Sequence, residues 1–141
     1  MDCSEFVARF IQKSCNIASV PNPFYTSLMT GSILNGRFDS FLKYVENSNN
    51  EDFKDIMPGD VFLWSRSYND GHTCVVVSYD KETDKVTVIE TIGISGAAEE
   101  ALSKIFENYC KGCIRKSIYT RNGKALYKHD GWKGYFRVIT N

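Results

Sequence analysis

The sequence predicts an α+β protein in which N-terminal helices pack on an antiparallel β-sheet. Helical periodicity and helix-breaking residues mark roughly the first third of the chain. Runs of β-branched and aromatic residues, separated by polar turns, mark the remainder. Helices first and strands afterwards are typical of an α+β fold.

The first expected element is an amphipathic helix that begins after Asp2. Its apolar residues recur along one face: Phe6, Val7, Phe10 and Ile11. Asp2 is a suitable N-cap, and Glu5, three positions later, completes a capping box. A second helical or irregular stretch is expected over 24–34, after the helix-breaking Pro21-Asn22-Pro23 and before the turn Asn35-Gly36.

The strands are expected after the turn Pro58-Gly59-Asp60. A short strand over 61–64 is followed by a polar loop over 65–71. The β-branched run over 72–79 predicts a central strand, and residues 86–91 return antiparallel to it as a hairpin. The remaining expected elements are a surface loop over 46–51, a helix over 97–109, and strands over 113–119 and 135–139.

The length and composition of the chain limit the classes of protein to which it can belong. A chain of 141 residues with 43% hydrophobic residues fits a single domain over 1–141. Its formal net charge is zero, so no basic surface for nucleic acid is expected. No apolar run is long enough to span a membrane, and the first residues do not resemble a secretory signal.

Five cysteines leave at least one thiol unpaired under any full disulfide scheme. Cys110 and Cys113 have a spacing found in redox and metal sites, but zinc would need two further ligands, and His129 is the only histidine nearby. A disulfide or ordinary buried thiols are the favoured alternatives. We therefore expect no metal and no organic cofactor.

Cys3 is the best candidate for a reactive group. A cysteine in the first turn of a helix lies next to exposed backbone N–H groups and the positive end of the dipole, which favour the thiolate. Of the two histidines, His72 at the start of a strand is the candidate base, whereas His129 resembles a solvated turn residue. The hairpin returns Glu90 to the neighbourhood of His72, where a carboxylate orients an imidazole, although period-2 alternation leaves its face open.

These residues resemble a known family. Asp2-Cys3-Ser4-Glu5-Phe6-Val7 is similar to the Asp-Cys-Ser-Gly-Phe-Val nucleophile motif of NlpC-type bacterial cell-wall peptidases. Pro58-Gly59-Asp60-Val61 resembles their Pro-Gly-Asp turn, and Gly71-His72 resembles their Gly-His-Val segment. Glu5 departs from the customary glycine, and the tyrosine that commonly precedes the cysteine has no counterpart. The resemblance spans residues 3–90.

The resemblance implies a papain-like fold and a cysteine hydrolase that cleaves amide bonds in peptidoglycan stem peptides through a thioester. The implied catalytic triad is Cys3, His72 and Glu90, and Glu90 fits the related CHAP amidases better than NlpC-type enzymes. Ser4 resembles the family residue that contacts the stem peptide. Trp64 is a candidate for lining the substrate groove, with a place in the core as the alternative.

The resemblance also implies a location outside the cytoplasm and a peptidoglycan peptide as substrate. Two alternatives stay open at the level of sequence. The chain could be an antibacterial amidase effector whose partner is an immunity or inhibitor protein. It could also be a catalytically inactive wall-binding module on the same scaffold.

Overall fold

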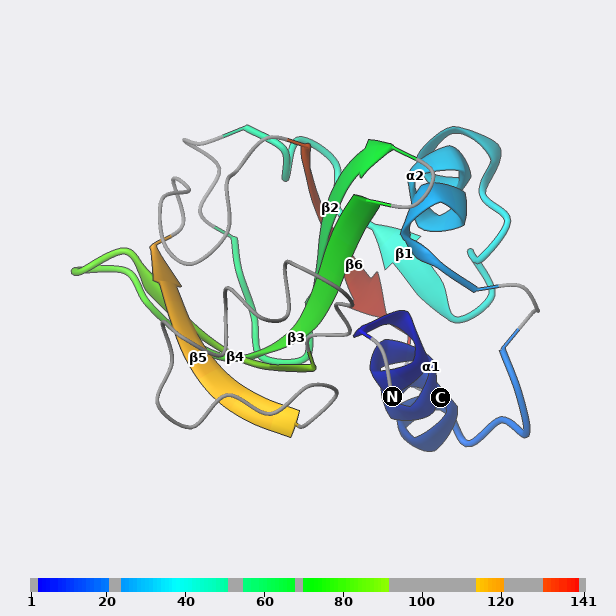
Figure 1. The fold of residues 1–141 in the computed structure, drawn as a ribbon, viewed down its shortest axis with the longest axis horizontal. Coiled ribbons are helices and arrows are strands. Elements are labelled where there is room, and N and C mark those ends of the chain that lie inside the picture. Colours follow the sequence, from blue (N-terminus) through cyan, green and yellow to red (C-terminus); the bar gives the residue numbers. More distant parts are fainter. Residues whose placement is uncertain are drawn as a thin grey trace, which may run out of the picture.

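The computed structural model describes residues 3–20, 24–50, 55–67, 70–91, 114–120 and 131–139. These residues form an α+β fold in which two helices pack on one antiparallel sheet (Figure 1). The helices are α1 (Cys3–Cys15) and α2 (Thr26–Asn35). The strands are β1 (Leu42–Tyr44), β2 (Val61–Ser67), β3 (Asp70–Asp80), β4 (Lys85–Thr91), β5 (Ile114–Thr120) and β6 (Trp132–Val138).

The six strands form one sheet in the order β1-β6-β2-β3-β4-β5, and every neighbouring pair is antiparallel. Strands β2 to β5 follow one another along both the chain and the sheet. Strand β6 breaks this order because it inserts between β1 and β2. The last described strand therefore joins the helical first part of the chain to the central hairpins.

Both faces of the central strands are buried, and alternation along each strand separates two cores. Helices α1 and α2 lie on one side of β2 and β3, whereas β4 and β5 curve away on the other side (Figure 1). The helix-side core includes Val7, Ile11, Met29, Val61, Leu63, Val75 and Phe136. The second core is rich in aromatic rings and includes Phe62, Trp64, Cys74, Val76, Val88, Tyr119 and Tyr135.

Most of the expected elements within the described residues are present, with shifted bounds. Both helices, the central hairpin, and the strands near 113–119 and 135–139 are confirmed. The expected polar loop over 65–71 is wrong in most of its length, because β2 continues to Ser67 and β3 begins at Asp70. Backbone pairing of Ser65 with Gly71 gives these polar residues a place in the ladder, and a register shift near Ser65 absorbs the irregularity.

Four further expectations lie outside the described residues: the helix over 97–109, the cap formed by Asp2, the pairing of Cys110 with Cys113, and the turn at His129. Strand β1 was not expected, because three residues are too short for a periodic signal. Among the described residues, neither helix is long and apolar enough to cross a bilayer.

Candidate active site

Cys3 is the first residue of α1, and its side chain is half-buried. The apolar stripe of the helix supplies Val7 and Ile11 to the helix-side core, so the helix is held against the sheet by its buried face. Its first turn lies beside β3 (Figure 1). The packing of α1 thus fixes where the thiol of Cys3 lies.

His72 lies on β3 and contacts both of the other predicted catalytic residues. Its side chain forms a hydrogen bond with Cys3. Its Nε2 atom is 2.7 Å from Oε2 of Glu90 on β4. The imidazole therefore bridges a sulfur from the helix and a carboxylate from the neighbouring strand. Proximity of His72 and Glu90 is what the hairpin led us to expect, while the catalytic roles stay predictions.

Glu90 is fully buried, and both carboxylate oxygens have partners. Arg115 on β5 donates from Nε and Nη2 to Oε1, at 3.2 and 3.1 Å. The hydroxyl of Tyr119 lies 2.9 Å from Oε1 and 2.7 Å from Oε2. These contacts restrain the carboxylate, and the carboxylate in turn restrains the His72 ring.

The electrostatics of the site favour opposite charges on His72 and Glu90. Burial by itself would lower the pKa of His72, but hydrogen bonds and charges from Cys3 and Glu90 outweigh it and raise that pKa to about 9. Burial would raise the pKa of Glu90, whereas contacts with His72, Tyr119 and Ser117 lower it to about 2. An imidazolium facing a carboxylate is therefore the favoured state at neutral pH.

The glycine that precedes His72, Gly71, has a steric role. A Cβ atom there would lie 2.6 Å from the backbone oxygen of Trp64 and would also collide with the side chain of Thr26. The bare backbone lets the start of α2 approach β3 closely. The Gly-His segment thus has a steric reason that is independent of any catalytic role.

Trp64 and Ser4, the two predicted substrate-binding residues, are both largely buried. Trp64 is only 4% exposed, and its ring stacks on His72 with the ring centroids 5.6 Å apart. Ser4 is 8% exposed. A substrate would touch little of either side chain in this conformation. Trp64 instead packs in the second core, where one of its ring contacts restrains the His72 ring.

The turn that resembles the Pro-Gly-Asp motif has a clear structural basis. Asp60 is 1% exposed and accepts a hydrogen bond from the backbone N–H of Met57, at 2.8 Å. Gly59 has a φ of 91°, which favours glycine. Arg137 on β6 donates to Asp60 through Nε at 2.9 Å and Nη2 at 3.0 Å. The motif thus links the start of β2 to β6.

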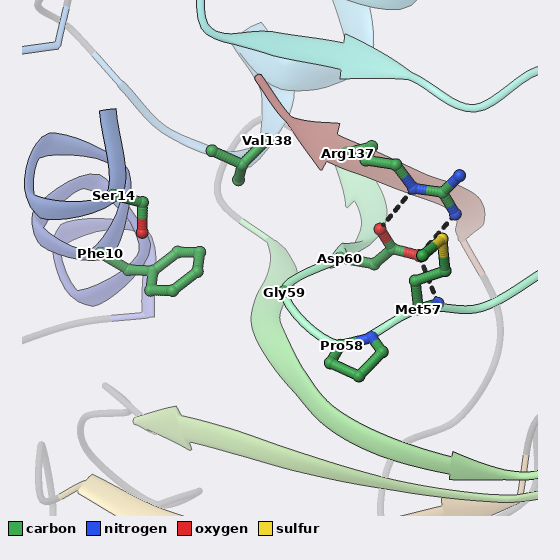
Figure 2. Close-up of a pocket in the computed structure, with 8 residues that line it drawn as sticks. All are labelled: Phe10, Ser14, Met57, Pro58, Gly59, Asp60, Arg137 and Val138. Carbon is green, nitrogen blue, oxygen red and sulfur yellow. Dashed lines mark hydrogen bonds and ion pairs between the residues drawn. The ribbon is translucent and has the colours of Figure 1, made fainter. Parts of the chain in front are cut away.

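A pocket of about 280 Å³ lies beside this turn (Figure 2). It is lined by Phe10, Ser14, Met57, Pro58, Gly59, Asp60, Arg137 and Val138. Phe10 is about 10 Å along the helix axis from Cys3, and Ser14 is about 16 Å away, so the pocket is separate from the Cys3 site. The charged groups in its wall, Asp60 and Arg137, already pair with each other.

Four residues of the site were missed from the sequence: Cys74, Arg115, Ser117 and Tyr119. Cys74 follows His72 by two positions on a strand, so period-2 alternation places it on the same face. That signal was available in the sequence. Arg115 and Tyr119 alternate in the same way on β5, but nothing in the sequence specifies that β5 pairs with β4.

The fold and the site define an α+β protein with a cysteine, a histidine and a glutamate joined at the contact between a helix N-terminus and a sheet. Comparisons with known protein families, curated proteins and solved structures found no match for this chain. The chemistry of these side chains is therefore the basis on which a function is proposed for the protein.

Proposed function

We propose that the protein is a cysteine hydrolase with a papain-like arrangement of Cys3, His72 and Glu90, acting on amide bonds of peptidoglycan stem peptides. The observation that carries the proposal is the continuous chain of contacts from the Cys3 thiol through His72 to Glu90. Nucleophilic catalysis by cysteine needs these three parts: a thiol, a base within hydrogen-bond reach, and a group that orients the base. The substrate class comes from the resemblance to NlpC-type and CHAP-type enzymes.

The proposed reaction begins from a thiolate–imidazolium pair, in which the proton of the Cys3 thiol lies on His72. The thiolate attacks the amide carbonyl and forms a carbon–sulfur bond, and the imidazolium gives its proton to the departing amine as the carbon–nitrogen bond breaks. Water then attacks the thioester while neutral His72 accepts a proton from it. Cleavage of the carbon–sulfur bond releases the acid and restores the thiolate–imidazolium pair.

Two structural features support this sequence of steps. Glu90 stabilises the imidazolium form of His72 at a distance of 2.7 Å, and Arg115 keeps the carboxylate in place. The first backbone N–H groups of α1 have no partners within the helix, so that of Cys3 is available to the oxyanion of the tetrahedral intermediate. One such donor typically contributes about 3–4 kcal/mol to lowering the barrier.

The test is release of soluble fragments from purified sacculi by the protein and by Cys3→Ala and His72→Ala variants. Each substitution is expected to abolish release, while Cys15→Ala is the matched control. Cys15 is a buried thiol at the other end of α1, and its sulfur contacts the backbone oxygens of Phe41 and Ile139. Mass spectrometry of the fragments identifies the bond that is cut.

Unchanged release by Cys3→Ala would reject the nucleophile, and unchanged release by His72→Ala would reject the base. Absence of release by the unaltered protein, together with iodoacetamide alkylation of Cys3 no faster than that of a model thiol, would favour an inactive binding module. Equal thermal unfolding midpoints for the variants show that a loss of activity is not a loss of folding.

A further inference from the structure

Cys74 is a buried thiol beside the proposed catalytic groups, and the proposed reaction does not use it. It lies on β3 two residues after His72, and its exposure is 0%. Val75 pairs with Ile89 across the β3–β4 ladder, so Cys74 and Glu90 occupy the next opposing positions. One donor atom from each of His72, Cys74 and Glu90 lies within 4.8 Å of the other two.

We propose that His72, Cys74 and Glu90 form a binding site for Zn²⁺, and that occupancy of this site switches off the hydrolase. Imidazole nitrogen, thiolate sulfur and carboxylate oxygen are the three ligand types that zinc takes in proteins. Three protein ligands leave the fourth position of a tetrahedral ion open to water. The binding part stands by itself, whereas the inhibition part rests on the proposed function.

The present separations are close to those that an ion needs. Zinc bonds of about 2.0–2.3 Å in a tetrahedral arrangement separate the ligand atoms by roughly 3.3–3.7 Å. Nε2 of His72 and Oε2 of Glu90 are 2.7 Å apart, so they would move apart by roughly half an ångström. The sulfur of Cys74 lies within 4.8 Å of one ligand atom of His72 and one of Glu90, and it would move inward. Side-chain rotations of this size leave the strands unchanged.

The charges of the site also suit a divalent cation. A Cys74 thiolate and the Glu90 carboxylate together balance Zn²⁺, so the ion adds no uncompensated charge to the buried site. Zinc would displace the thiol proton of Cys74 and the proton shared by His72 and Glu90. Arg115 and Tyr119 already hold the Glu90 carboxylate by hydrogen bonds to its oxygens, as outer partners of metal ligands do.

Zinc in this site is incompatible with the proposed reaction, because the imidazole of His72 cannot hold the ion and act as a base at the same time. One ring nitrogen would hold the ion, and the other, in a neutral ring, carries a proton. His72 would then have no lone pair with which to accept a proton from Cys3 or from water. The ion also removes the hydrogen bond by which Glu90 orients the ring.

Binding is tested by titrating metal-free protein with Zn²⁺ in competition with a chromophoric chelator. The parent for this test carries Cys110→Ser and Cys113→Ser, because that pair could bind zinc independently. We expect one equivalent of Zn²⁺ per chain. Cys74→Val should weaken binding by more than the roughly 10–100-fold that loss of an outer partner costs. Cys15→Ala and Cys3→Ala should bind like the parent.

Co²⁺ substitution gives a second measurement that does not depend on how well Cys74→Val folds. A thiolate-to-cobalt charge-transfer band is expected in the parent and in the Cys3→Ala variant. Absence of stoichiometric zinc in the parent, or equal zinc affinity in the folded Cys74→Val variant, would overturn the site. Loss of zinc binding in Cys3→Ala would show that Cys3 is a ligand of the ion, and this would also overturn the proposed site.

Inhibition is tested by measuring hydrolysis of sacculi with and without Zn²⁺. The rate of each variant with zinc is compared with its own metal-free rate. The parent is expected to lose activity with one equivalent of zinc and to regain it with a chelator, whereas Cys74→Val should lose far less. Because the ligands are buried, inhibition should develop slowly. If the protein binds zinc through Cys74 but has no hydrolytic activity, the hydrolase proposal is refuted and the zinc site stands. If the protein hydrolyses sacculi but binds no zinc, the zinc site is refuted and the hydrolase proposal stands.

Discussion

Two buried carboxylates on the sheet, Glu90 and Asp60, meet the same physical requirement in different ways. Each is almost fully inaccessible to water and needs partners for its oxygens. Asp60 pairs with Arg137, whose pKa is raised further by that contact, so the partner stays charged. Glu90 also pairs with a guanidinium, that of Arg115, but its other charged partner is His72, which can gain or lose a proton and also contacts a thiol.

The difference shows that burial of an acid does not by itself mark a site of chemistry. Where a guanidinium is the only charged side-chain partner described next to the buried carboxylate, as for Arg137 and Asp60 apart from the exposed Asp55, the pair acts as a clamp, because the guanidinium keeps its charge near neutral pH. An imidazole partner makes the acid part of a system that can move protons. Both acids contact an arginine, so the additional imidazole at Glu90 is what separates the carboxylate of the candidate active site from the structural one.

The largest expected effect is a difference in hydrolytic activity between variants of the two acids, Glu90 and Asp60. Glu90→Gln keeps the size of the side chain but cannot stabilise the imidazolium, so release of peptide from sacculi should fall on the order of 10²–10⁴-fold. Asp60→Asn should leave the rate close to that of the unaltered protein. It should instead lower the free energy of unfolding by about 2 kcal/mol, measured by urea titration, because a charged hydrogen-bonded pair is lost.

Equal losses of activity in the two variants would break this comparison, since they would make Glu90 no more than a second clamp. A suitable check on folding is the circular dichroism of each variant at the temperature of the assay.

The next effect is on the pH dependence of stability in metal-free buffer. His72 has a pKa of about 9 in the folded protein against 6.5 unperturbed, so its stabilising effect is complete below about 6.5 and is lost as the pH rises through 9. Glu90 has a pKa of about 2 against 4.5, so its effect is complete above about 4.5 and is lost as the pH falls through 2. The free energy of unfolding should therefore be highest between pH 4.5 and 6.5.

Between pH 6.5 and 9 the free energy of unfolding should fall by up to about 1.4 kcal/mol per pH unit, and His72→Gln should remove this slope. The Asp60 and Arg137 pair contributes no slope there, because Arg137 stays protonated. A flat profile for the unaltered protein over that range would contradict the charge assignment of His72. Equilibrium urea titrations at a series of pH values provide the measurement.

The smallest expected effect is that of Tyr119→Phe. This change removes one hydroxyl from the oxygens of Glu90 and keeps the ring in the second core, so unfolding should become easier by about 1 kcal/mol. Activity should fall far less than in Glu90→Gln, because Arg115 still holds the carboxylate. A loss of activity as large as that of Glu90→Gln would mean that Tyr119 itself has a direct part in the chemistry.

The local elements of the fold were accessible from the sequence because their signals are local. The apolar stripe of α1 and the charged turn between β3 and β4 depend on neighbouring residues only. The extent of β2 and β3 was not accessible, because polar residues such as Ser65 join a strand through backbone pairing with Gly71. The place of β6 between β1 and β2 depends on contacts between distant segments, which a single sequence does not reveal.

The same difference between local and long-range contacts decides which parts of the candidate site could be predicted. Contact between His72 and Glu90 could be anticipated because the two residues belong to one hairpin. The roles of Arg115 and Tyr119 could not, because they arrive from a strand whose pairing is a matter of tertiary structure. Trp64 was a candidate for the substrate groove, and only the packing of aromatic rings places it against His72.

The distance along the polypeptide between Cys3 and its partners has a consequence for biosynthesis. Cys3 precedes His72 by 69 residues and Glu90 by 87. At a translation rate of about 5–20 residues per second, the thiol is made roughly 4–17 s before the glutamate that completes the cluster. During that interval the nascent chain carries Cys3 without the imidazole and the carboxylate of the folded cluster, so the cluster can form only after the central hairpin has emerged.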